Sequence, residues 1–300
     1  MDRFIEMRAF VQVVDSGSFV RAAEALEISK AVVSRVIGEL EERLGVRLLN
    51  RTTRRLSLTE DGDIFCTRCR HLLADLQEAE LEVASRKGKA VGLVKIAAPV
   101  SFGILHLSEV WGQFRARHRQ VTLDVVLSDR IVDLVEDGFD LAIRIARLET
   151  SSLVQRKLAS TRLVMCASPQ YLKRAGAPAQ PSDLARHSIL AYSLWSGGDD
   201  WQLDGPDGPA SVRTTPCIRS NNGDVCRAGA LAHQGIILQP TFLVGDDLEA
   251  GRLVEVLPAY RSVEMGIYAV YPNRKHLPVK VRLLIDFLAN WFKTERWAQV

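Results

Sequence analysis

The stretch that decides the fold is SFVRAAEALEISKAVVSRVIGELEERLG, residues 18–45. It predicts two helices joined by a short turn, because Ser18 and Ser29 each stand where a side-chain oxygen can cap the first turn of an apolar-periodic segment. The first helix is expected over 18–26, with a pair of small alanines on its inner face. The second begins at Ser29, ends at Gly45 and repeats apolar residues at helical spacing: Val33, Ile37, Leu40 and Leu44. Two helices that cross steeply over such a turn form a helix-turn-helix, whose second helix fits a DNA major groove.

The outer face of the second helix is polar at its N-terminal end. Lys30, Ser34 and Arg35 point away from the apolar side, and this end of a recognition helix usually meets base edges. The next segment, RLLNRTTRRLS at 47–57, carries cations and hydroxyl groups without an acid, which suits phosphate contacts. Taken alone, that segment is explained as well by a solvated basic loop; beside a helix-turn-helix pattern, DNA is favoured. The residues predicted to contact DNA are Ser18, Ser29, Lys30, Ala31, Val32, Ser34, Arg35, Arg51, Thr52, Thr53, Arg54 and Arg55.

Residues 1 to about 62 resemble the N-terminal domain of LysR-type transcriptional regulators. The resemblance rests on GSFVRAAEAL, on VSRVIGELEERLGVRLLNRTTRRLSLTEDG and, later, on EDGFDLAIRI, and it extends over the whole chain in length and order of parts. It implies a winged helix-turn-helix, a linker helix that packs antiparallel with its copy, and a two-lobed sensor domain like a periplasmic binding protein. Early in the recognition helix, the family often has Gln or Pro and then Ser or Pro, where this chain has Lys30 and Ala31. The operator sequence is therefore left open.

Length and composition fit this organisation. The 300 residues, 47% of them hydrophobic, allow two domains with real cores and a connector. The net charge of only +3 does not by itself indicate nucleic acid, but the cations cluster locally between Arg43 and Arg55. No secretory signal opens the chain, and no run approaches the roughly 18 apolar residues of a membrane span. We therefore expect a cytoplasmic protein.

The five cysteines are irregularly spaced and do not indicate a disulfide framework. Cys66 and Cys69 in CTRCRH resemble a metal or haem signature, but Arg70 separates Cys69 from His71 and no second ligand pair lies nearby. We expect no metal and no cofactor. Cys217 and Cys226 leave open a redox-responsive regulator, since one branch of the resembled family senses oxidants in that way. Buried, unreactive thiols are the favoured alternative.

A long helix is predicted after the wing. Thr59 would cap it, and Glu60, Asp61 and Asp63 place acids at its N-terminus. Its apolar residues alternate at steps of four and three, which is a heptad seam: Phe65, Cys69, Leu72, Leu76, Ala79 and Val83. We expect this seam to meet a copy of itself and hold two DNA-binding domains at a fixed separation; a helix lying on its own sensor domain is the alternative. The predicted domains are 1–58 for the winged helix-turn-helix, 59–89 for the linker dimerisation helix and 90–300 for the effector-binding domain.

From Leu93 onward the pattern changes to alternating strands and helices, which predicts an α/β domain with a parallel sheet. The expected elements are strands at 93–99, 121–127, 139–145, 162–168 and 264–272 and helices at 103–118, 131–137, 223–233 and 279–292. An excursion over about 162–263 leaves one lobe and returns to it. This predicts lobe I over about 90–161 and 264–300, lobe II over about 162–263, and a cleft between them.

Ligands of open α/β sheets bind at the carboxyl ends of strands and at helix N-termini. That rule selects the candidate effector contacts Val100, Ser101, Phe102, Ser128, Asp129, Arg144, Asn221 and Asn222. For each of them the alternative is an ordinary helix cap, or for Arg144 a structural ion pair. The set implies a small anionic effector, such as a carboxylate.

Two other classes of function are weighed against a regulator. An enzyme would need a nucleophile elbow, HExxH or GxxxxGK, none of which occurs. A solute-binding protein would explain the two lobes but not the N-terminal domain. The sequence thus predicts a DNA-binding transcriptional regulator, not an enzyme, that is modulated by a small effector. It would form a dimer or tetramer and act with RNA polymerase as a further partner.

Overall fold

The computed structural model describes residues 2–51, 56–84, 90–147, 154–272 and 277–293. The chain divides into two compact units, residues 1–88 and 89–300. Each unit has its own hydrophobic core.

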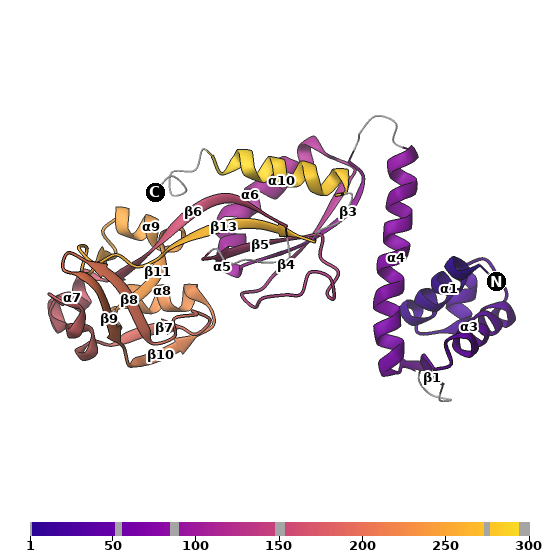
Figure 1. The fold of residues 1–300 in the computed structure, drawn as a ribbon, viewed down its shortest axis with the longest axis horizontal. Coiled ribbons are helices and arrows are strands. Elements are labelled where there is room, and N and C mark those ends of the chain that lie inside the picture. Colours follow the sequence, from indigo (N-terminus) through magenta and orange to yellow (C-terminus); the bar gives the residue numbers. More distant parts are fainter. Residues whose placement is uncertain (1, 52–55, 85–89, 148–153, 273–276, 294–300) are drawn as a thin grey trace. The chain divides into compact units, whose positions relative to one another are not determined.

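The N-terminal unit is a helix-turn-helix with a small two-stranded wing and a long helix (Figure 1). Its elements are α1 Arg3–Ser16, α2 Phe19–Ala25, α3 Lys30–Leu44, β1 Leu49–Arg51, β2 Leu56–Leu58 and α4 Glu60–Ala84. The predicted caps are confirmed: Ser18 Oγ accepts from the amide of Val20 at 3.3 Å, and Ser29 Oγ accepts from the amide of Val32 at 3.3 Å. Gly45 ends α3 in the left-handed conformation, at φ 72°. These ends follow from local hydrogen bonds.

The core of this unit lies between α1, α2, α3 and the first turns of α4. Phe10, Ile37 and Leu40 are fully buried in it. Glu6 is also buried, and Arg43 Nη2 reaches its carboxylate at 2.5 Å, which ties α1 to the end of α3. Because an unpaired carboxylate in this place would be costly, the ion pair belongs to the fold rather than to the DNA-binding surface.

Helix α4 begins as predicted, with Thr59 Oγ1 accepting from the amide of Gly62 at 2.9 Å. The first part of the predicted seam packs inside its own unit: Cys69 is buried in the core, and the Phe65 ring lies 5.7 Å from that of Phe10. Leu72 is 48% exposed, and Leu76 is half-buried. The side chains of Ala79 and Val83 lie outside the described residues. A heptad pattern alone does not say whether the same unit or a second α4 covers a seam position. Here Phe65 packs on Phe10 of α1, and Cys69 is buried in the core of its own unit.

The C-terminal unit is built on a seven-stranded sheet in the order β11-β6-β13-β5-β3-β4, with β12 pairing with β6 (Figure 1). Its strands are β3 Gly92–Ala98, β4 Val121–Leu127, β5 Leu141–Ala146, β6 Val154–Ala167, β7 Ile189–Tyr192, β8 Asp200–Gly205, β9 Gly208–Arg213, β10 Pro216–Ser220, β11 Ile237–Pro240, β12 Val254–Glu255 and β13 Glu264–Tyr271. Its helices are α5 Val100–Phe102, a π-helical turn Gly103–Leu107, α6 Ser108–Arg117, α7 Pro169–Ala175, a 3-10 helix Pro181–Arg186, α8 Gly223–Leu231, α9 Thr241–Glu249 and α10 Val279–Trp291.

Within the seven-stranded sheet, the predicted parallel arrangement is confirmed for β3, β4 and β5. The strands that cross between the lobes are antiparallel: β13 pairs with β5 on one side and with β6 on the other. Strand β6 pairs with β13 over 154–162 and continues into lobe II, where residues 163–166 pair with β11. One long strand thus belongs to both lobes, as Figure 1 shows. Lobe II adds the parallel pair β7–β10 and the hairpin β8–β9.

The helix predicted over 131–137 is wrong; this segment forms turns. Asp133 Oδ1 accepts from the amides of Val135 and Glu136 at 2.8 and 2.9 Å, and the amide of Asp137 donates to the Asp133 carbonyl at 2.9 Å. Asp133 therefore caps a single turn that begins at Leu134, and no helix begins at Ile131. Of the apolar residues here, Leu134 is buried, while Ile131 is 86% exposed. The segment therefore lacks the apolar face that stabilises a short helix.

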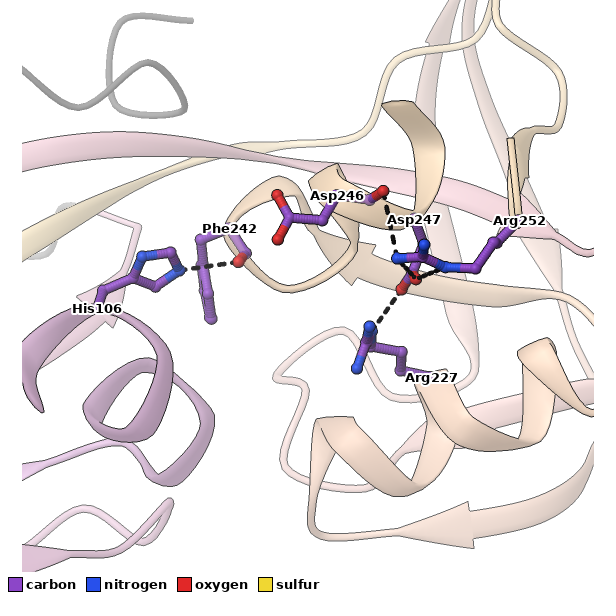
Figure 2. Close-up of polar contacts among 6 residues, drawn as sticks. All are labelled: His106, Arg227, Phe242, Asp246, Asp247 and Arg252. Atoms are coloured by element: carbon purple, nitrogen blue, oxygen red, sulfur yellow. Dashed lines mark hydrogen bonds and ion pairs between the residues drawn. The ribbon is translucent and has the colours of Figure 1, made fainter. Parts of the chain in front are cut away.

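The two lobes also touch where the π-helical turn meets α9. His106 Nε2 lies 2.9 Å from the carbonyl oxygen of Phe242 (Figure 2). The rings of Phe102 and Phe242 meet edge to face. Further along α9, the fully buried carboxylate of Asp247 is held between Arg227 of α8 and Arg252 (Figure 2). These contacts fix the position of α9, whose first turn lines a cleft between the lobes.

Candidate functional site

The outer face of α3 carries the cations predicted for it. Lys30, Ala31 and Arg35 are exposed, and Ser34 is half-buried. No acid lies in the first turn of α3. Arg35 forms only a loose pair with Glu39, at 3.8 Å, and such an exposed pair is weak enough to leave the guanidinium available. A positively charged N-terminal half of a helix is therefore presented to solvent.

The remaining helix-turn-helix predictions sort into structural and exposed positions. The hydroxyl oxygens of Ser18 and Ser29 accept hydrogen bonds that cap helices, and Val32 packs against the core of the unit. The turn between the helices places Glu27 at φ 56°, and the amide of Ile28 donates to the carbonyl of Ala23 at 3.0 Å. This turn sets the angle between α2 and α3.

The wing is held against α3 by a residue that the sequence reasoning missed. Glu41 Oε1 accepts from the amides of Leu48 and Leu49 at 2.9 and 3.1 Å, at the start of β1. Strand β1 then pairs with β2, with Asn50 opposite Ser57. Arg51 ends β1, but its side chain and the predicted contacts Thr52, Thr53, Arg54 and Arg55 lie outside the described residues.

A cleft of about 1040 Å³ lies between the two lobes of the C-terminal unit. Five predicted effector contacts line it: Ser101, Phe102, Ser128, Asp129 and Arg144. Val100, Asn221 and Asn222 are not among its lining residues. Asn221 is exposed, and Asn222 Oδ1 caps α8 by accepting from the amide of Val225 at 3.2 Å. Asn222 is therefore a helix cap in the structure, which is the alternative given for it above.

The corner of the cleft at α5 is acidic. Ser101 Oγ donates to Asp224 Oδ2 at 2.6 Å, which joins lobe I to α8 of lobe II. The amide of Val100 donates to Asp129 Oδ1 at 2.9 Å, so an aspartate already uses this helix N-terminus. Burial raises the pKa of Asp129, the Val100 amide lowers it, and the nearby Asp224 raises it further. The net shift is upward, and burial is its main cause.

Cations line other parts of the cleft. Arg144 Nη2 donates to the carbonyl of Val132 at 2.9 Å, so its position is fixed by the turn that replaces the predicted helix. Arg130 and Arg147 also line the cleft, and both are exposed. The charge of the effector accordingly stays a prediction.

Lobe II contributes residues that the strand-end rule did not select. Tyr192 ends β7 and lines the cleft; burial, together with Asp129 and Cys226, raises its pKa to about 12. Gln239 also lines the cleft and is buried. It is the one polar side chain in the apolar stretch GIILQP, and that isolated position was the signal available in the sequence.

The cysteines are free thiols in the structure. Burial raises the pKa of Cys66, and it raises those of Cys69 and Cys226 to about 12 and 11. Such thiols hold little thiolate at neutral pH and react slowly. Cys217 is exposed. The redox hypothesis for Cys217 and Cys226 stays untested, and the burial of Cys226 gives it no support.

Among the described residues, no three His, Cys, Asp or Glu side chains gather as a metal site would require. Nor does any described helix combine the length and the apolar character needed to cross a membrane.

A helix-turn-helix with a cationic outer face, followed by a two-lobed α/β unit with a cleft, defines a class of ligand-responsive DNA-binding proteins. Two family models match the chain: "Bacterial regulatory helix-turn-helix protein, lysR family" over residues 4–63 and "LysR substrate binding domain" over residues 87–293. The chain belongs to the LysR family of transcriptional regulators. It is therefore a regulator of transcription with an effector-binding domain, and not an enzyme.

Full-length relatives agree with this assignment. The transcriptional regulator CrgA of Neisseria meningitidis is 34% identical over 287 residues, 95% of each chain. The transcriptional activator AaeR of Escherichia coli is 32% identical over 294 residues, 97% of this chain and 94% of its own. The full-length structure of the Vibrio cholerae virulence activator AphB is 30% identical, with a TM-score of 0.64 over 96% of this chain and 99% of its own. Regulators of this family bind DNA and small effectors and form oligomers.

Proposed function

We propose that α3 reads base edges in a DNA major groove and that a small molecule in the interlobe cleft changes how the protein occupies its operator. One observation carries the proposal: a single chain holds both an exposed cationic recognition helix and a cleft of about 1040 Å³. A protein that only binds DNA would need the helix but not the cleft. A solute-binding protein would need the cleft but not the helix.

Lys30 is the base-reading residue that we favour on α3. It is exposed in the first turn, it has no acid beside it in that turn, and a lysine or arginine there can donate to guanine. Ala31, Ser34 and Arg35 would complete the contact surface. The wing residues Arg51, Thr52, Thr53, Arg54 and Arg55 would contact phosphates, which supply affinity rather than sequence preference.

The protein would act as a dimer or tetramer, with pairs of α4 helices packing from Leu72 onward. Two recognition helices would then reach half-sites about one helical turn, or a multiple of it, apart. Effector binding would change the closure of the lobes, which already touch through Ser101 and Asp224 and through His106 and Phe242. Such a coupling typically amounts to about 1–3 kcal/mol, enough to change operator occupancy severalfold. RNA polymerase would be the partner that reads this change.

The test is selection of bound fragments from genomic DNA by the full-length protein, followed by the same selection with Lys30→Ala. We expect paired half-sites for the parent protein and a changed base preference for the variant, worth about 1–3 kcal/mol at the affected base pair. Lys173→Ala, which removes a cation from α7 of the C-terminal unit, is the control. Equal weakening on every DNA sequence would mean that Lys30 touches only the DNA backbone. If the full-length protein selects no fragments even at low salt, the proposal as a whole is contradicted.

A further inference from the structure

The interlobe cleft contains a buried hydrogen-bond donor that has no acceptor. Gln239 on β11 is 3% exposed and lines the cleft. Its Nε2 is the one buried side-chain nitrogen or oxygen without a partner among the residues that the structure describes. Buried polar groups are almost always satisfied in a functional state, so an oxygen supplied from outside the chain is the natural partner of this donor.

The amide of Gln239 lies against the first turn of α8. A Cβ atom on Gly223 would come within 3.0 Å of Gln239 Oε1, so this glycine leaves room for the amide. The next residue is Asp224, whose carboxylate accepts from Ser101 Oγ at 2.6 Å. The unsatisfied donor and the acidic corner at α5 therefore meet at the same end of the cleft.

The charged residues that line the cleft have both signs, which indicates a ligand that also carries both. The positively charged residues that line the cleft are Arg130, Arg144 and Arg147, and the negatively charged ones are Asp129 and Asp200. Asp224, which accepts from Ser101 Oγ but does not itself line the cleft, brings the carboxylates to three against three arginines. A simple anion would meet Asp129 and Asp224 unfavourably, whereas an ammonium group would relieve the repulsion between them.

We propose that the effector is a small α-amino acid or close analogue, whose ammonium group lies by Asp129 and Asp224 and whose carboxylate accepts a hydrogen bond from Gln239 Nε2. The two carboxylates come from opposite lobes, because Asp129 follows β4 and Asp224 lies on α8. The ligand would therefore hold the lobes together. This assignment rests on the proposed function, in that it takes the cleft to be the effector site.

The experiment uses the full-length protein and the twenty standard L-amino acids as probes. Thermal unfolding finds the probes that bind, and calorimetry gives their Kd. For each one that binds, the matching 2-hydroxy acid and the amine without a carboxylate are measured as well. We expect at least one amino acid to bind and both analogues to bind at least about tenfold more weakly, because a site built around a charge or hydrogen bond rejects ligands that lack it.

Two variants locate the contacts. Gln239→Leu should weaken the amino acid about tenfold, and Asp129→Asn should remove the preference for the amino acid over its hydroxy acid. Gln113→Ala and Asp124→Asn, on exposed positions of α6 and β4, should leave every Kd unchanged. Thermal unfolding without ligand checks that each variant is folded.

The proposal is overturned if none of the twenty amino acids binds, if hydroxy acids bind as tightly as amino acids, or if folded Gln239→Leu protein keeps the parent Kd. An amino acid that binds as described but leaves the DNA footprint unchanged supports the ligand class. That result would contradict only the coupling in the proposed function.

Discussion

Replacing Asp247 with asparagine tests whether the packing of α9 depends on a buried charge. The Asp247 side chain has no exposed surface, and its two oxygens accept from Arg227 Nε at 2.5 Å and from Arg252 Nε at 2.7 Å (Figure 2). Breaking a buried ion pair by removing one partner costs about 3–5 kcal/mol. The Arg252 side chain is 53% exposed and stays hydrated, so we expect the lower end, about 3 kcal/mol. For a unit of this size, that corresponds to a midpoint lower by about 6–12 °C.

The pH dependence gives a second readout. Burial alone would raise the pKa of Asp247, but the hydrogen bonds and charges of Arg227 and Arg252 outweigh it and hold the pKa below its usual range. A carboxylate with a lowered folded-state pKa stabilises the protein above its unfolded pKa of about 3.9, and this stability is lost as the pH falls through the folded value. The destabilisation of the variant should therefore be largest near neutral pH and shrink in acid.

The assay is thermal and urea unfolding of the full-length protein, with the transition of the C-terminal unit followed from pH 7 downward. Asp246→Asn is the matched control, because Asp246 is the adjacent residue but is exposed, and only its backbone carbonyl contacts Arg252. Equal midpoints for the two variants, or a difference that does not depend on pH, would refute the reasoning.

Three further substitutions test the N-terminal unit. Gly62→Ala should destabilise this unit by several kcal/mol in urea unfolding, because its Cβ would lie 2.0 Å from the carbonyl oxygen of Leu48. Gly38→Ala should instead stabilise α3 by about 0.5–1 kcal/mol, because nothing lies within 4 Å of the added Cβ. A Gly62→Ala protein as stable as the parent would show that α4 shifts freely against β1. Leu72→Glu should leave the protein folded but raise its dimer Kd in sedimentation, since Leu72 is exposed on the predicted seam; an unchanged Kd would place the dimer contact elsewhere.

Helix boundaries and the division into parts were predictable from the sequence because they depend on neighbours in the chain. Ser18, Ser29 and Thr59 each cap a helix by accepting from an amide two or three residues away, so the pattern contains both partners of the hydrogen bond. The strands of lobe I were predictable for a similar reason, since their apolar runs are continuous. The helix expected over 131–137 does not form, because Asp133 caps a single turn that begins only at Leu134.

The tertiary structure alone decided which strand-end residues share the cleft and what occupies the predicted seam. Ser101 and its acceptor Asp224 are 123 residues apart, and no periodicity links them. Asn222 precedes a helix, as a ligand contact would, but its side chain caps α8. Gln239, which lies in an apolar strand, lines the cleft instead. Phe65 and Cys69 fit a dimer seam, but Phe65 packs on Phe10 of α1 and Cys69 is buried in the core of its own unit. Local hydrogen bonds and the spacing of apolar residues depend on residues that are close in the chain. The partner of a side chain across a cleft or a core is decided only when distant segments have packed together.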